Sequence, residues 1–142
     1  MTGAFLSVRP RFSQAILSGD KRVELRRRPP DCSPGDLVVV YETSPTKAIV
    51  AIATVTSVTR QSPEALWRSV GGWTAVTRSE FSEYFAGSPT AAGIHLSHVR
   101  VLPQPIPLSA AREIAPVFRP PQSWCYLSSL PAALIAHLEA LA

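Results

Sequence analysis

The stretch AILSGDKRVELRRRPP, residues 15–30, decides the fold because it takes the chain out of a helix and into a charged strand. Phe12 and Ile16 lie on one face at helical spacing, which predicts a helix over Arg11–Ser18. Gly19 follows at the position where glycine commonly ends a helix in the left-handed conformation. The sequence therefore predicts a short helix that stops just before the charged residues begin.

The second half of the stretch alternates in polarity, as a half-buried strand does. Val23 and Leu25 fall on one face of a strand predicted over Arg22–Arg28. The charged side chains fall on the other face: Arg22, Glu24, Arg26 and Arg28. Two prolines then end the strand, because proline cannot donate a hydrogen bond to a neighbouring strand. Glu24 is thus the one acid on a basic strand face.

The basic charge of the chain is concentrated around the same stretch. The 142 residues carry a formal net charge of +4. Arg9–Arg28 holds seven basic and two acidic side chains, whereas the rest of the chain holds seven basic and eight acidic ones. A concentrated positive field indicates an anionic partner, and phosphate is the commonest. The plainer interpretation is a solvated basic face without a partner.

Short β-prone runs separated by turns predict a sheet of five or six strands. Strands are predicted over Ala4–Val8, Val38–Tyr41 and Ala48–Thr56, in addition to Arg22–Arg28. Helices are inserted between strands without regular alternation, which argues against repeated β-α-β units. The predicted fold is α+β, a PUA-like mixed β-barrel with short peripheral helices, formed by a single domain over residues 1–142.

Capping signals predict where the inserted helices begin. Ser62, followed by a proline and an acid, is typical of a helix start. Thr77 and Glu80 have the spacing of a capping box. Two further helices are predicted over Leu108–Ala115 and Leu130–Leu141. The aromatic residues of the inserted helices are interpreted as packing: Trp67, Trp73, Phe81, Tyr84 and Phe85.

Composition excludes several classes of protein. No apolar run reaches the 18 residues typical of a transmembrane helix, and the N-terminus lacks the pattern of a signal peptide. Cys32 and Cys125 lack CxxC spacing and are interpreted as free thiols in a reducing cytoplasm. Together with three scattered histidines they form no ligand cluster, so neither a metal nor another cofactor is predicted. The sequence leaves the oligomeric state open.

Several fragments together resemble one known family. The charged stretch matches the pattern G-x-K-x-x-E-x-R, preceded by S-x-x-P, through Gly19, Lys21, Glu24, Arg26, Ser7 and Pro10. Further resemblance lies in VVVYETSPTKAIV (residues 38–50), WRSVGGWTAVTRSEFSEYFAG (residues 67–87) and PPQSWCYL (residues 120–127). From Ala4 to Leu127 the chain resembles the ASCH domains, which belong to the PUA-like β-barrel superfamily.

The resemblance implies a barrel with a cleft beside the first helix and the strand after it. Relatives bind RNA or nucleotides there, or are suspected to. One branch removes the acetyl group from a modified cytidine nucleoside, with a threonine nucleophile beside the lysine. Glu24 stands at the position of that threonine, and a carboxylate cannot replace the hydroxyl in the same acyl-enzyme chemistry. RNA cleavage is another behaviour reported in the family, and the sequence offers no separate signal for it.

The predicted site combines the basic strand with groups from other segments. The residues predicted to bind nucleic acid or a nucleotide are Ser7, Arg9, Lys21, Arg22, Glu24, Arg26, Arg28, Tyr41, Ser44 and Trp124. Arginines bind phosphate, Tyr41 and Trp124 are predicted to stack on unpaired bases, and ionised Glu24 accepts hydrogen bonds from a base amino group. Alternatively, Glu24 only holds Arg22 or Arg26 in an ion pair. Tyr41 and Trp124 are alternatively core residues.

Three functions remain open from the sequence. The leading prediction is a non-catalytic cytoplasmic module that binds RNA, another single-stranded nucleic acid or a modified nucleotide. The second is a small hydrolase acting on a modified nucleoside or RNA, with Lys21 and Glu24 as its catalytic pair. The third is a regulatory protein-interaction module whose basic strand docks an acidic partner.

Overall fold

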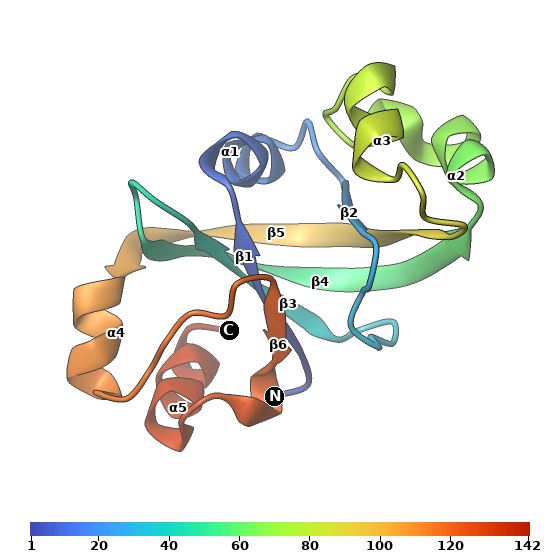
Figure 1. The fold of residues 1–142 in the computed structure, drawn as a ribbon. Coiled ribbons are helices and arrows are strands. Elements are labelled where there is room, and N and C mark those ends of the chain that lie inside the picture. The colour runs from blue at the N-terminus through green and yellow to red at the C-terminus, as the bar shows by residue number, and fades with distance from the viewer.

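The centre of the molecule is one six-stranded mixed sheet (Figure 1). The structure, a computed structural model, describes all 142 residues. The strands are β1 Gly3–Val8, β2 Val23–Arg26, β3 Leu37–Glu42, β4 Ala48–Gln61, β5 Ala91–Pro107 and β6 Trp124–Tyr126. Their order is β2-β5-β4-β3-β1-β6, and only β1 and β3 are parallel neighbours. The sheet is strongly curled into a half-barrel, which confirms the predicted α+β barrel-like fold.

Five α-helices and two short 3-10 helices surround the sheet. They are α1 Pro10–Ser18, α2 Pro63–Val70, η1 Gly71–Trp73, α3 Arg78–Tyr84, α4 Leu108–Ile114, η2 Leu127–Ser129 and α5 Ala132–Leu141. The predicted starts of α2 and α3 are confirmed, because Ser62 accepts a hydrogen bond from the Ala65 backbone and Thr77 forms a capping box with Glu80. Gly19 ends α1 with a φ of 89°. No helix has the length and apolar character needed to cross a membrane.

The long strands β4 and β5 give the sheet its curl. Their register shifts at three places, and within β5 His98 has a φ of 48°. Bulges of this kind bend a strand and increase its twist. The prediction that β4 ends at Thr56 is wrong, because its antiparallel pairing with β5 continues to Gln61 opposite Ala91. This extension carries the chain out to the inserted helices.

Two hydrophobic clusters lie on the sheet and explain why its central strands are apolar throughout. Phe5 and Val39 belong to a cluster that α4 and α5 cover. Leu6 and Val40, the next residues along the same strands, belong to a cluster that Ile16 of α1 covers. Alternate residues of β1 and β3 therefore enter different clusters, as expected for strands buried on both faces. This packing fixes α1 over the sheet.

The inserted helices α2 and α3 pack on β2 in a third cluster. Leu66 of α2 and Phe81 and Phe85 of α3 are buried together with Val23 of β2. The predicted packing role of these aromatic rings is confirmed, whereas Trp73 is 49% exposed. The contact with β2 places α3 on the same side of the sheet as α1, with β2 between them (Figure 1).

The two edge strands of the half-barrel, β2 and β6, do not pair with each other, since β2 pairs only with β5 and β6 only with β1. Side-chain hydrogen bonds join the two edges instead. The indole Nε1 of Trp124 donates to the Arg28 carbonyl at 2.8 Å. The Tyr126 hydroxyl accepts a hydrogen bond from the Asp31 backbone at 3.1 Å. These contacts, together with Arg26, close a seam that backbone pairing leaves open.

The predicted length of β2 is wrong. The strand covers Val23–Arg26 and not the whole of Arg22–Arg28, because its ladder with β5 ends opposite Ala92 and the chain then bends. At the other end, the Arg22 backbone N–H donates to the Trp73 carbonyl at 2.8 Å. The beginning of β2 is thereby tied to the inserted helices.

Candidate functional site

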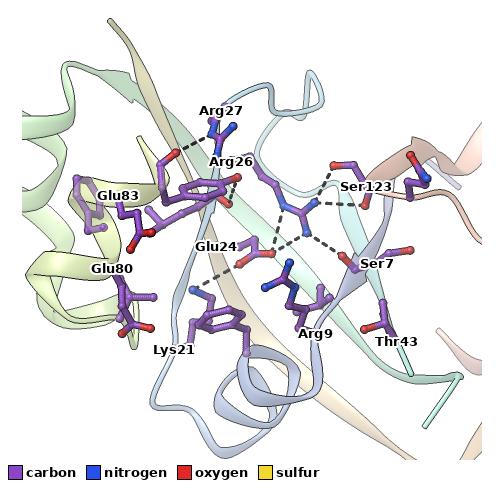
Figure 2. A pocket seen from close by; sticks show the side chains of 17 residues that line it. Ser7, Arg9, Lys21, Glu24, Arg26, Arg27, Thr43, Glu80, Glu83 and Ser123 are labelled. Atoms are coloured by element: carbon purple, nitrogen blue, oxygen red, sulfur yellow. Dashed lines mark hydrogen bonds and ion pairs between the residues drawn. The ribbon is translucent and has the colours of Figure 1, made fainter. Parts of the chain in front are cut away.

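A cleft of about 680 Å³ opens between α1, β2 and α3. Its charged lining residues are Arg9, Lys21, Glu24, Arg26, Arg27, Glu80 and Glu83. Polar and aromatic groups in the lining include Ser7, Phe12, Thr43, Tyr84, Gln122 and Ser123. The volume falls within the range of about 300–1,000 Å³ typical of small-molecule sites. Figure 2 shows the side chains that line the cleft, which come from separate segments of the chain.

The floor of the cleft is a cluster of the buried Lys21 and Glu24 with the partly buried Arg26, called here the floor cluster. Glu24 Oε1 lies 3.4 Å from Lys21 Nζ, and Glu24 Oε2 accepts from Arg26 Nε at 3.2 Å and Nη2 at 2.8 Å. The exposed fraction is 5% for Glu24 and 2% for Lys21. Glu24 is therefore held between two cations, and its arginine partner is Arg26 and not Arg22 (Figure 2).

Lys21 ties the floor cluster to the inserted helices. Its Nζ donates to the Thr74 carbonyl at 2.6 Å and lies 5.1 Å from the centre of the Phe12 ring. Burial lowers the pKa of Lys21, although the Glu24 carboxylate acts in the opposite direction. A lysine with a lowered pKa releases its proton more readily than a surface lysine, which suits it to proton transfer.

The guanidinium of Arg26 links β2 to β1 and to the segment before β6. Besides its two bonds to Glu24, it donates to the Ser7 carbonyl at 3.1 Å and to the Ser123 carbonyl and hydroxyl at 3.3 and 2.9 Å. These five hydrogen bonds match the five N–H donors of an arginine. Arg26 therefore holds the seam together and has no donor left for a ligand.

Two rim residues are already engaged by their neighbours. Arg27 donates through Nε to the Tyr84 carbonyl at 2.7 Å, and its guanidinium lies 4.6 Å from the centre of the Tyr84 ring. Glu80 accepts from Arg11 and from the backbone of Thr77, and the hydrogen bond from Arg11 is the main cause that lowers the pKa of Glu80 to about 2. These contacts fix the outer wall of the cleft.

Two other rim residues, Arg9 and Glu83, are not engaged. Both line the cleft and both are exposed. Neither side chain takes part in a hydrogen bond, ion pair or cation–π contact in the structure. The cleft therefore offers a cation without any contact at the start of α1 and a carboxylate without any contact on α3.

A second buried carboxylate, Glu42, holds α1 in place. Its side chain is 3% exposed and accepts hydrogen bonds from Gln14 Nε2 at 2.7 Å and from the Thr46 hydroxyl. Burial acts to raise the pKa of Glu42, but hydrogen bonds from Thr46 and Gln14 lower it overall. Because Gln14 belongs to α1, this network keeps α1, and with it the preceding Arg9, beside the cleft.

The structure brings together half of the residues predicted for the site. Those that line the cleft are Ser7, Arg9, Lys21, Glu24 and Arg26. Those that do not are Arg22, Arg28, Tyr41, Ser44 and Trp124. The first group lies at the positions where β1, α1 and β2 converge, whereas the second group points into the core, the seam or solvent.

Tyr41 and Trp124 do not supply aromatic faces to the cleft. Tyr41 is 4% exposed and stacks on Phe5, with ring centroids 5.8 Å apart, in the cluster beneath α4 and α5. Trp124 packs beside the cluster beneath α1 and uses its indole N–H in the seam. The aromatic rings that line the cleft are Phe12, Phe81 and Tyr84.

The remaining three residues lie outside the cleft for different reasons. The Arg22 guanidinium lies 4.7 Å from the centre of the Trp73 ring. Arg28 is exposed beyond the end of β2. Ser44 lies in the turn after β3, and its neighbour Thr43 lines the cleft.

Sequence reasoning missed the wall that α3 and the segment before β6 contribute. The sequence pattern predicts capping for Glu80 and packing for Tyr84, and it gives no signal for Glu83. Gln122 and Ser123 lie within the fragment PPQSW, whose resemblance to the family was already a usable signal. The α3 residues become recognisable only once the inserted helices are known to pack on β2.

The arrangement divides the chemistry of the cleft between its floor and its rim. The floor cluster provides a titratable lysine and a carboxylate, but their hydrogen-bonding groups are engaged by the protein. The rim provides the free charges and the aromatic rings. No group of three or more His, Cys, Asp or Glu side chains is arranged to hold a metal ion, and both cysteines are free thiols.

Comparison with known proteins decides the family. Residues 6–101 match the sequence profile of the ASCH domain. The chain is also 32% identical over 124 residues to an ASCH domain-containing ribonuclease from Zymomonas mobilis, a match that covers 87% of this chain and 83% of the relative. This chain belongs to the ASCH domain family. The matched residues of the ASCH domain include the floor cluster and both α1 and α3.

Solved structures support the same assignment for the fold. The crystal structure of ASCH from Zymomonas mobilis matches with a TM-score of 0.87 and 30% identity, covering 97% of this chain and 94% of that one. A variant of the Zymomonas protein with tyrosine replaced by phenylalanine gives a TM-score of 0.87 at 29% identity, covering 97% and 96% of the two chains. The resemblance first visible in the G-x-K-x-x-E-x-R pattern is therefore confirmed.

Proposed function

We propose that this ASCH domain binds single-stranded RNA and holds an unpaired nucleotide in the cleft between α1 and α3. The observation that carries the proposal is a free guanidinium, Arg9, in a cleft that also presents the rings of Phe12 and Tyr84. RNA is favoured as the ligand because the Zymomonas relative is a ribonuclease.

Each part of the cleft has a physical role in this proposal. Arg9 binds a phosphate, since a guanidinium offers two parallel N–H donors to phosphate oxygens. The rings of Phe12 and Tyr84 provide surfaces for a base, and base–aromatic stacking contributes about 1–3 kcal/mol per base. Bases can reach such surfaces only when they are unpaired, so a single strand is the expected ligand.

Binding is tested by comparing Arg9→Ala with Arg28→Ala. Both substitutions remove an exposed arginine of the same basic segment, but only Arg9 lines the cleft. Fluorescence anisotropy with a labelled single-stranded RNA at several salt concentrations gives the affinity and its salt dependence. Arg9→Ala is expected to weaken binding and to reduce the slope of log affinity against log salt by about 0.7. Equal effects of the two substitutions, or no RNA binding by the parent protein, would contradict the proposal.

RNA cleavage is a second candidate function, favoured by the activity of the Zymomonas relative. In cleavage by the neighbouring ribose hydroxyl, a base takes the 2′-hydroxyl proton, the O2′–phosphorus bond forms and the phosphorus–O5′ bond breaks. An acid then supplies a proton to O5′, and a cation stabilises the charge that develops on the phosphate. Lys21 and Glu24 are the proton-transfer groups proposed for this step, and Arg9 is the proposed cation.

Cleavage is tested by incubating end-labelled RNA with the parent protein and with Lys21→Met. The parent is expected to produce fragments that end in a 2′,3′-cyclic phosphate, and Lys21→Met is expected to produce none. Circular dichroism establishes that the variant is folded, and Arg9→Ala provides a second variant with a reduced rate. Undiminished cleavage by both variants would exclude this mechanism, and binding without cleavage would leave the domain as a binding module.

A further inference from the structure

The two walls of the cleft carry opposite free charges. On the α1 wall, Arg9 has no partner, and on the α3 wall, Glu83 has none. Of the other charged groups of the lining, the floor cluster is paired within itself and Glu80 is paired with Arg11. Arg27 has no acidic partner, and it is held at the end of β2 by its Nε hydrogen bond to the Tyr84 carbonyl and by its contact with the Tyr84 ring. A ligand that fills the cleft therefore meets a free cation on one side and a free carboxylate on the other.

One orientation of a nucleotide is favoured by these charges. The α1 wall carries Arg9 and no carboxylate, so it attracts the phosphate, whereas the free carboxylate of Glu83 on the α3 wall repels it. The base then lies toward α3, where the Tyr84 ring and the stacked Arg27 guanidinium provide flat surfaces of the kind on which unpaired bases stack. The base edge is left facing Glu83. An ionised carboxylate only accepts hydrogen bonds, so it selects a base edge that donates.

We propose that Glu83 makes the cleft selective for bases with an exocyclic amino group, and this inference rests on the proposed function. Cytosine presents the N4 amino group, adenine the N6 amino group and guanine the N2 amino group. Uracil presents an O4 acceptor where cytosine has its amino group, and its N3–H donor lies between two carbonyl acceptors that a carboxylate repels. The RNA that this domain binds therefore carries an amino base, and not uracil, at the nucleotide in the cleft.

The experiment uses two pairs of RNA hexamers in which one member of each pair lacks the exocyclic amino group. Guanosine against inosine removes the amino group alone from a purine, and cytidine against uridine exchanges it for an oxygen and adds a proton at ring nitrogen N3. Binding of the four labelled hexamers is measured by fluorescence anisotropy under one salt condition. The amino member of each pair is expected to bind about tenfold more tightly, as for one good base-edge contact.

Glu83→Gln is the decisive variant. Glutamine has a similar shape but offers both a donor and an acceptor, so it serves either member of a pair. The preference within each pair is expected to fall from about tenfold to near equality. Glu113→Gln, which removes an exposed carboxylate on α4 outside the cleft, is the matched control and keeps the preference.

The outcomes separate this inference from the proposed function. If all four hexamers bind equally well to the parent protein, or if Glu83→Gln keeps the full preference, the inference is wrong while RNA binding stands. If no hexamer binds, the proposed function falls, and the inference falls with it. A preference that disappears in Glu83→Gln and persists in Glu113→Gln supports both.

Discussion

The floor and the rim of the cleft contain the same kinds of side chain but use them in opposite ways. On the floor, Lys21, Glu24 and Arg26 are at most slightly exposed and are fully engaged with one another and with the backbone. At the rim, Arg9 and Glu83 are exposed and free. The charged residues of the G-x-K-x-x-E-x-R pattern lie on the floor of the cleft, whereas the two free charges belong to residues outside this pattern.

This difference separates charges that build the site from charges that meet a ligand. A buried carboxylate between two cations is stable only while all three are present, because loss of one leaves another charge buried without a partner. An exposed, unpaired charge contributes little to folding, so its removal affects mainly what it binds. Substitutions on the floor are therefore expected to change stability, and substitutions at the rim to change binding.

Glu24→Gln is expected to have the largest effect on stability. Glutamine keeps the shape but leaves the charges of Lys21 and Arg26 without an anion in a buried position. The free energy of unfolding is expected to fall by about 3–5 kcal/mol, measured by urea denaturation. Glu113→Gln, on the surface of α4, is expected to change it by less than about 0.5 kcal/mol. A loss of similar size in both variants would contradict the structural role of Glu24.

A double substitution sharpens this prediction. Lys21→Met removes one of the two cations that Glu24→Gln leaves unpaired, and burial already lowers the pKa of Lys21. The double variant is therefore expected to lose less stability than the sum of the two single variants, by about 0.5–3 kcal/mol. Strict additivity of the two losses would show that the two side chains are not coupled.

Arg26→Lys is expected to have the next largest effect. Lysine keeps the positive charge beside Glu24, but its compact ammonium group cannot replace the five hydrogen bonds that the guanidinium makes. The bonds to the Ser7 and Ser123 carbonyls are the ones lost, so the seam between β2 and β6 is weakened. A decrease of about 2 kcal/mol in the free energy of unfolding is expected. Stability equal to that of the parent would show that only the charge of Arg26 matters.

The sequence was sufficient to predict those features that depend on neighbouring residues. The caps at Ser62 and Thr77 are local hydrogen bonds, and the left-handed conformation at Gly19 is a property of one residue. The alternation of Val23 and Leu25 with charged residues correctly placed Glu24 and Arg26 on one face. Local chemistry determined these features, so local patterns revealed them.

The sequence was insufficient where the outcome depends on contacts between distant segments. The sequence places Tyr41 near the end of an apolar strand but does not show which face of the sheet its ring occupies. Only the packing of α4 and α5 on one face places that ring in the core. Gln14 lies five residues after Arg9, and its part-buried hydrogen bond to Glu42 helps to hold α1 beside the cleft. Glu83 became a site residue only through the packing of α3 on β2. None of these contacts is encoded in a short pattern.

Glu80→Gln is expected to have a smaller, pH-dependent effect at the rim. The hydrogen bond from Arg11 contributes most to lowering the pKa of Glu80, from the ordinary value of 4.5 to about 2. The ionised carboxylate therefore stabilises the folded state fully above about pH 4.5, and this contribution is lost as the pH falls through about 2. The difference in melting temperature between the parent and Glu80→Gln is expected to be largest near neutral pH and to vanish toward pH 2. High salt is expected to reduce it, because both partners are exposed.

Arg9→Ala is expected to have the smallest effect on stability and a large effect on RNA binding. Arg9 precedes α1 and its carbonyl accepts the first hydrogen bonds of the helix, from the backbones of Phe12 and Ser13. Those bonds do not involve the side chain, and the side chain makes no capping bond. Alanine therefore leaves the helix start intact, and the free energy of unfolding is expected to change by less than about 0.5 kcal/mol. Urea denaturation and RNA binding are measured on the same preparation, with Arg26→Lys as the opposite case, in which the loss of stability is the main effect. If Arg9→Ala lowered stability as much as Arg26→Lys, the rim would be part of the architecture, and the division between floor and rim would be wrong.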